Sequence, residues 1–511
     1  MEMLGRLVAH VDSWSQWLVG SADGRSTYAV TRWLFLRALG LIYLIAFASL
    51  WVQVKGLIGS QGILPAVQSL QALKGYLGSD RYHLVPTLFW LGSSDLALQL
   101  ACAAGVGCAL LLVGNIAAIP ALIALWVLYL SLATVGRDFL AFQWDVLLLE
   151  TGWLAIFFAP ARLLPGRADT APVSATVLLL LWWLLFRLAF QSGLVKLTWG
   201  DPVWRDMTAL DYHFYTQPLP TWSAWFAQQL PSWLKRVAVV LMYVLEIGFP
   251  FLIFGPTGAR LIACAGIVLL QIVIFKTGNY TFFNLLTIVL ALSLVDDVAW
   301  ARLLPERFIR GFAAGSSAAG PPAGAIRTAL AVLVLTISAI KFWDNLSPRT
   351  SVPGYAEWLT RWAEPFRSVN SYGLFRVMTT SRSEIVVEGS DDGSTWRAYE
   401  FKYKPGDVAR RPEFVEPHQP RLDWQMWFAA LSRYDATPWF QALLVRLLEG
   451  SPPVLDLLAR NPFPAHPPRY VRAVRYDYRF TTAAERKATG AWWSRTLVGA
   501  YSPVVSLTAP R

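Results

Sequence analysis

The sequence predicts a multi-pass α-helical membrane protein that carries a C-terminal extramembrane domain. Of its 511 residues, 55% are hydrophobic and only 15% are charged, whereas soluble domains contain roughly 25% charged residues. Apolar runs that can cross a bilayer, at about 17–25 residues each, recur over the first two thirds of the chain. After about residue 347 charged and turn-forming residues become frequent, and no such run remains.

Nine apolar runs in the predicted transmembrane domain, residues 31–346, are candidate spans. They lie at about residues 32–52, 95–113, 116–135, 143–160, 174–196, 237–254, 260–276, 280–296 and 326–343. The fourth, seventh and eighth runs are short, so the sequence also allows seven or eight spans. Residues 1–30 come first, and there Leu4, Leu7 and Val11 repeat at helical spacing. This spacing predicts an amphipathic helix on the membrane surface.

Basic residues beside the runs predict the orientation, because positively charged loops stay on the cytoplasmic side. With the N-terminus inside, the inner side holds Arg25, Arg32, Arg162, Arg167, Arg260, Arg302, Arg307 and Arg310. Nine spans then place the long loop 197–236 and the C-terminal domain, residues 347–511, outside. These flanks and their contacts with lipid account for the net charge of +11, so lipids rather than nucleic acid are the expected partners.

Short alternating patterns after residue 347 predict a β-rich or α+β domain, most readily a β-sandwich. The predicted elements are strands at 384–388, 396–403 and 469–480, a turn at 390–394 and helices at 421–431 and 452–463. The domain has roughly 160 residues, which is enough to form a core of its own.

Ionisable residues interrupt three of the apolar runs. Glu150, Arg187 and Glu246 lie near the centres of the fourth, fifth and sixth runs, and Gln191 is one helical turn from Arg187. An arginine at the bilayer centre costs on the order of 2.5–3.5 kcal/mol even on lenient scales, so it needs a partner. We expect Arg187 to pair with Glu150 or Glu246. Such a pair could fix helix packing or line a cavity for a ligand, and the sequence leaves both open.

Lys196, at the outer end of the fifth run, is the candidate catalytic residue. A lysine in a partly desolvated pocket can act as a base, but a lysine at a helix end can equally anchor the helix at the membrane surface. Further site candidates follow in the outer loops: Asp201, Arg205, Asp206, His213, Gln217, Asn279 and Asn284. For the two asparagines, capping of a helix end is the alternative.

No metal site or cofactor is expected. The histidines lack metal-ligand spacing, and Cys102, Cys108 and Cys264 all lie within apolar runs rather than in a disulfide or zinc pattern. Walker, GxGxxG and GxSxG patterns are also missing from the sequence. A bound lipid is the one small-molecule ligand that these patterns leave open.

Long segments along nearly the whole chain resemble the lipase maturation factor family. They include LIGSQGILP (57–65), LLLETGWLAIFFAP (147–160), GNYTFFNLLT (278–287) and the stretch that starts NSYGLFRVMTTSRSEIVVEGS and ends at residue 431. The resemblance implies a non-enzymatic, chaperone-like membrane protein that helps secreted lipases or other exported proteins to mature. It also implies that the C-terminal domain meets the client.

Four residues in 421–431 are candidate client contacts under this resemblance: Arg421, Asp423, Trp424 and Trp427. The alternative for the two tryptophans is the core face of their helix. Animal members of the family are proteins of the endoplasmic reticulum membrane. The Ala-, Arg- and Gly-rich, Lys-poor composition instead indicates a bacterial source. That source would place the protein in the inner membrane, with a cytoplasmic N-terminus and a periplasmic C-terminal domain.

A second similarity covers only the membrane part. GLVKLTWGDPVW (193–204) resembles the segment that carries the catalytic lysine of the vitamin K-dependent carboxylases, and Lys196 is the matching position. The resemblance implies an alternative function, an integral-membrane enzyme or lipid-binding protein that works in a polar cavity around Lys196.

Overall fold

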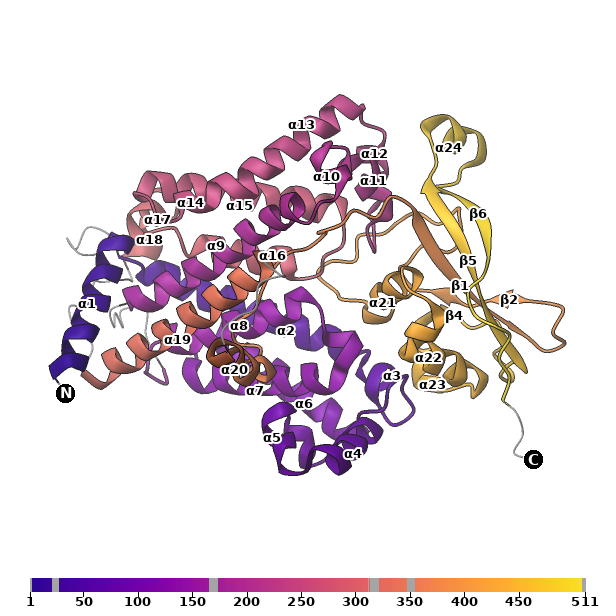
Figure 1. The fold of residues 1–511 in the computed structure, drawn as a ribbon, viewed down its shortest axis with the longest axis horizontal. Helices are drawn as coiled ribbons and strands as arrows, with labels where there is room; N and C mark the ends of the chain where they lie inside the picture. The colour runs from indigo at the N-terminus through magenta and orange to yellow at the C-terminus, as the bar shows by residue number, and fades with distance from the viewer. Residues whose placement is uncertain are drawn as a thin grey trace.

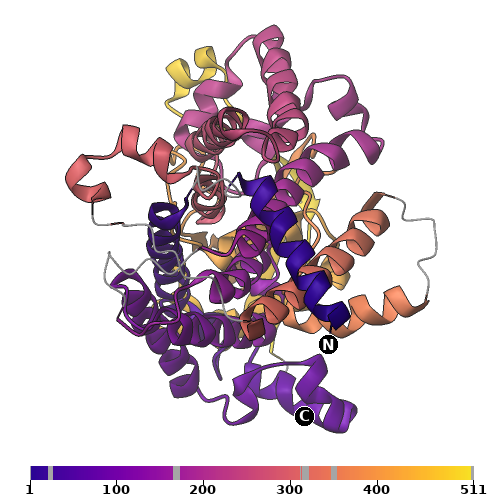
Figure 2. The same ribbon diagram turned by 90° about the vertical axis from the view of Figure 1, so that its left-hand side faces the viewer.

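A bundle of helices forms one end of the molecule and an antiparallel sheet forms the other, so the two chain termini lie far apart (Figure 1). The structure is a computed structural model that describes residues 2–20, 27–164, 173–310, 312, 321–346 and 354–507. The first helix, α1 (Glu2–Val19), packs against α9 and α19 and lies across the end of the bundle (Figure 2). The predicted N-terminal helix is therefore present.

Six helices of the described ranges are long and apolar enough to cross a membrane. They are α2 (Ala29–Trp51), α6 (Asp95–Val113), α7 (Ala118–Gly136, which a 3-10 turn extends to Leu140), α9 (Ala175–Thr198), α15 (Thr257–Thr277) and α19 (Pro321–Leu346). A seventh span results if α16 (Phe283–Leu292) and α17 (Asp297–Leu303) count as one helix bent by 110°. The chain is thus a multi-pass membrane protein.

The expected count of nine spans is not confirmed, because the remaining apolar runs form shorter helices. The fourth run is α8 (Gln143–Phe158), whose 16 residues extend about 24 Å, less than the roughly 30 Å of a bilayer core. The sixth run is divided into α13 (Ser232–Tyr243), a π-helical turn (Val244–Gly248) and α14 (Phe249–Leu252).

Among the six long helices, α2 and α9 are the most buried. Their hydrophobic windows are 61% and 67% buried inside the protein and that of α7 is 56% buried, whereas those of α6, α15 and α19 are 33% buried. The lower buried share of the latter three is typical of helices that face lipid. Shorter helices form the connections: α3 (Val54–Ile58), α4 (Ala66–Leu77), α5 (Arg81–Leu84), α10 (Pro202–Arg205), α11 (Ala209–Thr216), α12 (Trp222–Gln228), α18 (Glu306–Ile309) and α20 (Gly354–Ala363).

The C-terminal domain contains a four-stranded antiparallel sheet in the order β2-β1-β5-β6 and a separate ladder of β3 and β4. The strands are β1 (Arg382–Ser390), β2 (Arg397–Ala398), β3 (Glu400–Phe401), β4 (Leu458–Arg460), β5 (Tyr470–Phe480) and β6 (Trp493–Ala500). The helices are α21 (Arg421–Ala430), α22 (Pro438–Leu448), α23 (Pro452–Leu455) and α24 (Ala483–Thr489). The predicted strand 469–480 and helix 421–431 are confirmed.

The prediction of a β-sandwich is wrong. In the described part of the domain, α21 packs on β1 and α22 on β5, so helices rather than a second large sheet cover the four-stranded sheet on the side of the bundle (Figure 1). The α+β alternative describes the domain. The helix predicted at 452–463 is also too long, because residues 458–460 leave it to pair with β3.

Gly56 in α3 lies at a close contact between the bundle and the C-terminal domain. A Cβ atom at this position would overlap the carbonyl of Pro453 in α23 and the side chain of Leu457. The missing side chain therefore allows a contact between two parts of the chain that are far apart in sequence.

Replacing Gly56 by alanine is expected to force α3 and α23 apart. The free energy of unfolding of the full chain in detergent should fall by about 1–3 kcal/mol, seen as a lower melting temperature. Gly75→Ala is the matched control, because Gly75 in α4 is also helical and a Cβ there has no atom within 4 Å. Equal melting temperatures for the two variants would contradict the tight contact.

Candidate functional site: a polar interface between the bundle and the C-terminal domain

A buried ion pair holds Arg187 inside the bundle. Its guanidinium contacts the carboxylate of Glu150 in α8, and the two side chains are 1% and 0% exposed. Arg187 therefore pairs with Glu150, one of the two partners expected from the sequence. Opposite charges in direct contact offset part of each other's desolvation, which explains how α9 tolerates an arginine in its apolar interior.

A segment of the C-terminal part of the chain, residues 370–372, completes this cluster. Glu150 Oε2 accepts hydrogen bonds from the backbone N–H and side-chain Nδ2 of Asn370, at 2.9 and 3.0 Å, and from the hydroxyl of Tyr372 at 2.7 Å. Arg187 Nη1 donates to the Asn370 carbonyl at 2.8 Å, and Gln191 Oε1 accepts the Tyr372 N–H at 3.0 Å. Glu150, Arg187 and Gln191 therefore form a socket that residues 370–372 fill, hereafter the bundle socket.

A second connection joins Arg421 at the start of α21 to Asp145 at the start of α8. The two Nη atoms of Arg421 donate to the two carboxylate oxygens of Asp145 at 3.0 and 2.9 Å. This bidentate geometry is the strong and directional form of an arginine–carboxylate contact. The Tyr129 hydroxyl donates to the same carboxylate at 2.5 Å, and the Arg421 backbone N–H donates to Gln53 Oε1 at 2.9 Å. Four separate parts of the chain therefore meet at Arg421.

A third connection uses the loop after α15. Asn279 Oδ1 accepts the Val415 N–H at 2.7 Å, and its Nδ2 donates to the Glu413 carbonyl at 2.8 Å. The Glu416 carboxyl accepts the Tyr280 N–H, and burial raises the pKa of Glu416 to about 9, although that hydrogen bond and a weak one from Asn284 oppose the shift. Glu416 is therefore neutral at pH 7.

Two of the outer-loop candidates support the same interface. Asp201 Oδ1 caps α10 through the Val203 N–H at 2.9 Å, and its Oδ2 accepts the Met378 N–H at 2.5 Å. Gln217 donates to the Thr277 carbonyl at 2.7 Å and accepts the Tyr280 hydroxyl at 3.0 Å. Its backbone carbonyl accepts a hydrogen bond from Arg382 Nη1 of the C-terminal domain. By contrast, the neighbouring Arg205 and Asp206 side chains are exposed and lie apart from these contacts.

Lys196 pairs with Glu246 at the π-helical turn. Its ammonium group contacts the Glu246 carboxylate, lies 3.7 Å from Met242 Sδ and is 5.3 Å from the centroid of the Trp204 ring. A Cβ at Gly193 would come within 2.9 Å of Glu246 Cβ, so this glycine lets α9 approach the π-helical turn.

His213 is in α11, where the charge of Lys196 acts on its imidazole. Its Nε2 is 3.4 Å from the Tyr280 hydroxyl, and its ring centroid is 4.9 Å from that of Phe375, which the C-terminal segment supplies. Burial and the nearby charge of Lys196 lower the pKa of His213 to about 4. The imidazole is therefore neutral at pH 7, and its buried Nδ1 makes no hydrogen bond with the described residues.

The four candidate client contacts in residues 421–431 are buried inside the protein. Arg421, Asp423, Trp424 and Trp427 are 0%, 3%, 4% and 9% exposed. Asp423 accepts the N–H groups of two residues that follow β3, and Trp427 Nε1 donates to the Thr216 carbonyl at 2.8 Å. The two tryptophans form the core face of their helix, the alternative that the sequence left open.

Sequence reasoning missed several residues of the interface: Asp145, Asn370, Tyr372 and Glu416. Asp145 lies at the start of the fourth apolar run and could be read as a helix-capping residue, and it does accept the Phe142 N–H at 3.4 Å. Asn370 and Tyr372 lie in a polar stretch that resembles an ordinary connection. No local signal in the sequence shows that this stretch enters the bundle.

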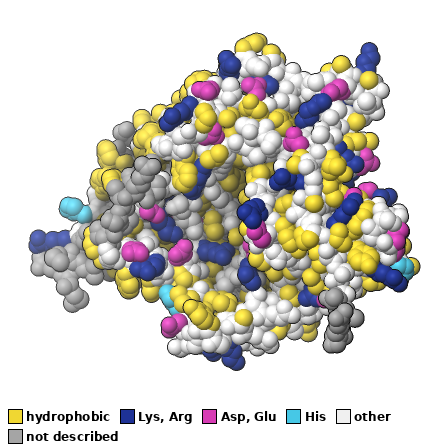
Figure 3. Space-filling view, turned by 45° about the vertical axis from the view of Figure 1, so that its right-hand side comes forward, with side chains coloured by type: hydrophobic (Ala, Val, Ile, Leu, Met, Phe, Trp, Pro, Cys, Tyr) yellow, Lys and Arg dark blue, Asp and Glu magenta, His cyan; other side chains and the backbone are white. Residues whose placement is uncertain are grey.

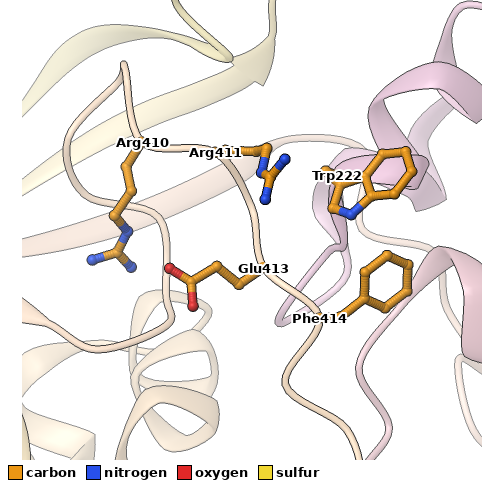
Figure 4. Close-up of a pocket in the computed structure, with 5 residues that line it drawn as sticks. All are labelled: Trp222, Arg410, Arg411, Glu413 and Phe414. Atoms are coloured by element: carbon orange, nitrogen blue, oxygen red, sulfur yellow. The ribbon is translucent and has the colours of Figure 1, made fainter.

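An open cleft lies beside the third connection. Its volume is about 520 Å³, and its walls are Trp222, Arg410, Arg411, Glu413 and Phe414. The Arg411 guanidinium extends toward Trp222, while Arg410 and Glu413 lie on the other side (Figure 4). The rings of Trp222 and Phe414 are 37% and 38% exposed. The cleft therefore presents aromatic and basic groups at the surface, unlike the buried α21.

Both parts of the chain match models of known domains. Residues 30–302 match the lipase maturation factor transmembrane domain, and residues 368–503 match the lipase maturation factor C-terminal domain. The chain is 38% identical to lipase maturation factor 2 of Gallus gallus and of Homo sapiens, over 94% of this chain and 82% and 83% of those proteins. It is 37% identical to lipase maturation factor 1 of Bos taurus, over 94% of this chain and 90% of that protein. No solved structure matches the chain.

Removing the Glu150 carboxylate is expected to destabilise the whole protein. Glu150→Ala leaves Arg187 buried without its counter-charge, which should lower the free energy of unfolding by about 3–5 kcal/mol. Tyr372→Phe removes one hydrogen bond from the same carboxylate and should lower it by only about 1–2 kcal/mol. Thermal unfolding of the two variants in detergent measures the difference. Equal losses would show that the charge of Arg187 does not depend on Glu150.

Glu416 is expected to make the stability pH-dependent. Between pH 4.5 and 9 only the unfolded chain ionises this carboxyl, so its contribution to stability falls as the pH rises and is constant above pH 9. At pH 8, Glu416→Gln should therefore be more stable than the unmodified chain by at least about 1.4 kcal/mol, the value of a one-unit pKa shift. At pH 4.5 the two should be equally stable. Glu413→Gln, an exposed position in the same loop, is the control and should change neither value.

Proposed function

The chain belongs to the lipase maturation factor family, and from this premise we propose that it helps exported proteins such as secreted lipases to fold and assemble. Both domain matches and their order along the chain support this role. In this proposal the bundle anchors the protein in the membrane, and the C-terminal domain meets the client on the outer side.

The observation that carries the proposal is the way in which the C-terminal domain is held. The bundle socket, the Arg421–Asp145 pair and the Asn279 loop bind three different segments of the domain through buried contacts. Because these contacts are distributed along residues 370–421, the domain is fixed in one orientation on the bundle. A domain that is held in one orientation suits a protein that presents the same surface to successive clients.

The proposed orientation places the N-terminus in the cytoplasm and the C-terminal domain outside. The termini lie at opposite ends of the molecule, as an odd number of spans requires (Figure 1). Seven spans, with α16 and α17 as one bent span, and the nine spans of the sequence prediction both meet this requirement. The outer compartment is the lumen of the endoplasmic reticulum by analogy with the vertebrate relatives, or the periplasm if the composition indicates a bacterial source.

An alternative function, catalysis or lipid binding around Lys196, is supported by the cluster of Lys196, Glu246 and His213 beneath the outer loops. One observation weighs against catalysis. The Lys196 side chain is already held by the Glu246 carboxylate.

Lys196→Arg distinguishes the two functions. Arginine keeps the positive charge that Glu246 needs but cannot serve as a base, because it does not lose its proton. We expect cells that lack a maturation factor to secrete an active dimeric lipase when they express either the unmodified chain or Lys196→Arg, with activities within about twofold. Loss of at least tenfold in lipase activity for Lys196→Arg alone, at equal membrane abundance, would favour catalysis. No activity with the unmodified chain would overturn the maturation role.

A further inference from the structure

The four-stranded sheet ends in β6, whose outer edge has no strand beside it. The sheet order places β6 next to β5 and nothing beyond it. The only main-chain hydrogen bonds found on this outer edge, within the part of the chain that the structure describes, join the N–H groups of Trp492 and Trp493 to the Val408 carbonyl at 3.0 and 3.1 Å. From residue 494 to the end of β6, no main-chain hydrogen bond from the described residues occupies the outer edge.

The pairing with β5 shows which backbone groups point outward. Trp493 lies opposite Phe480, and its N–H points away from β5, because it donates to Val408. The direction of backbone groups alternates along an antiparallel strand. The N–H and C=O groups of Arg495 and Leu497 therefore also point outward. Two donors and two acceptors at the spacing of a strand are matched together by an extended backbone.

The side chains of β6 leave this edge open. Leu497 and Val498 are 61% and 51% exposed, whereas edge strands of soluble proteins are commonly protected by charges or by a covering segment. The one charged side chain of the strand, Arg495, turns back onto the sheet, where it donates to the Tyr478 hydroxyl at 3.1 Å and lies 4.7 Å from the centroid of Tyr476. A bulge at Val498 ends the regular part of the edge and limits the incoming strand to a few residues.

The edge also lies where a partner can reach it. β6 is on the side of the C-terminal domain that faces away from the bundle, while α21 and α22 are on the side of the bundle (Figure 1). The surface at this end of the molecule mixes hydrophobic side chains with basic and acidic ones (Figure 3). A strand added to β6 would therefore meet neither the membrane nor the contacts that hold the domain.

We propose that β6 binds an extended, strand-forming segment of an incompletely folded exported protein by adding it to the sheet. The proposal rests on the maturation role, which supplies a partner whose strands have not yet found their own neighbours. Main-chain hydrogen bonds to Arg495 and Leu497 give the contact, and Leu497 and Val498 add apolar area. Because backbone groups carry most of the recognition, one edge can serve clients of different sequence.

The test uses the full chain in detergent and a fluorescent octapeptide of alternating threonine and valine with charged ends. We expect the peptide to bind, and Leu497→Pro, which removes one outward N–H, to weaken binding about tenfold. Leu507→Pro is the matched control, because Leu507 is also exposed but follows the last strand, and it should bind as the unmodified chain does. The same peptide N-methylated at alternate residues should also lose about tenfold in affinity.

Unchanged binding to Leu497→Pro would overturn the proposal, as would equal binding of the methylated peptide. A dimer that Leu497→Pro converts to a monomer, without peptide binding by the unmodified chain, would also overturn it and assign the edge to a second copy. Secretion of active lipase distinguishes this result from failure of the maturation role. If only strand addition is wrong, Leu497→Pro and Leu507→Pro both restore secretion, whereas failure of the unmodified chain to restore it would reject the role itself.

Discussion

The contact on which the structure depends is the buried pair of Arg187 and Glu150. A charge in the interior of a membrane bundle is stabilised when it is paired and makes further hydrogen bonds. Neighbouring helices supply the pairing, but residues 370–372 supply the remaining hydrogen bonds of Glu150. The bundle therefore depends on a segment from the other domain, and the C-terminal domain receives its position from the same contact.

The two domains differ in amino-acid composition, but they pack against each other. Composition changes near residue 347, and the two family matches end and begin on either side of that point. Three kinds of buried contact join the residues on either side of this point. They are an ion pair with shared hydrogen bonds, a bidentate arginine contact and a neutral buried carboxyl. A protein built in this way behaves as one unit, and a surface on the sheet keeps a fixed distance from the membrane.

Apolar run length predicted the six long apolar helices, and alternation predicted the strand at 469–480, because these elements depend on local sequence. The need of Arg187 for a partner was also predictable from its cost in an apolar run. The role of Asn370 and Tyr372 was not, because it depends on residues 181 to 222 positions earlier and has no periodic signal. Trp424 and Trp427 show a related limit, since an aromatic helix face looks the same in a core as on a binding surface. The sheet edge at β6 follows from strand order, which one sequence does not specify.

The filling of the bundle socket by residues 370–372 has a consequence for biogenesis. A ribosome releases the chain from its N-terminus, so α8 and α9 are made long before the residues that complete their polar contacts. Until residues 370–372 have been made and have packed against the bundle, Glu150 and Gln191 lack their final hydrogen-bond donors. Completion of the bundle and folding of the C-terminal domain are thus successive parts of one process, and a product truncated before residue 370 would carry an unfinished polar core.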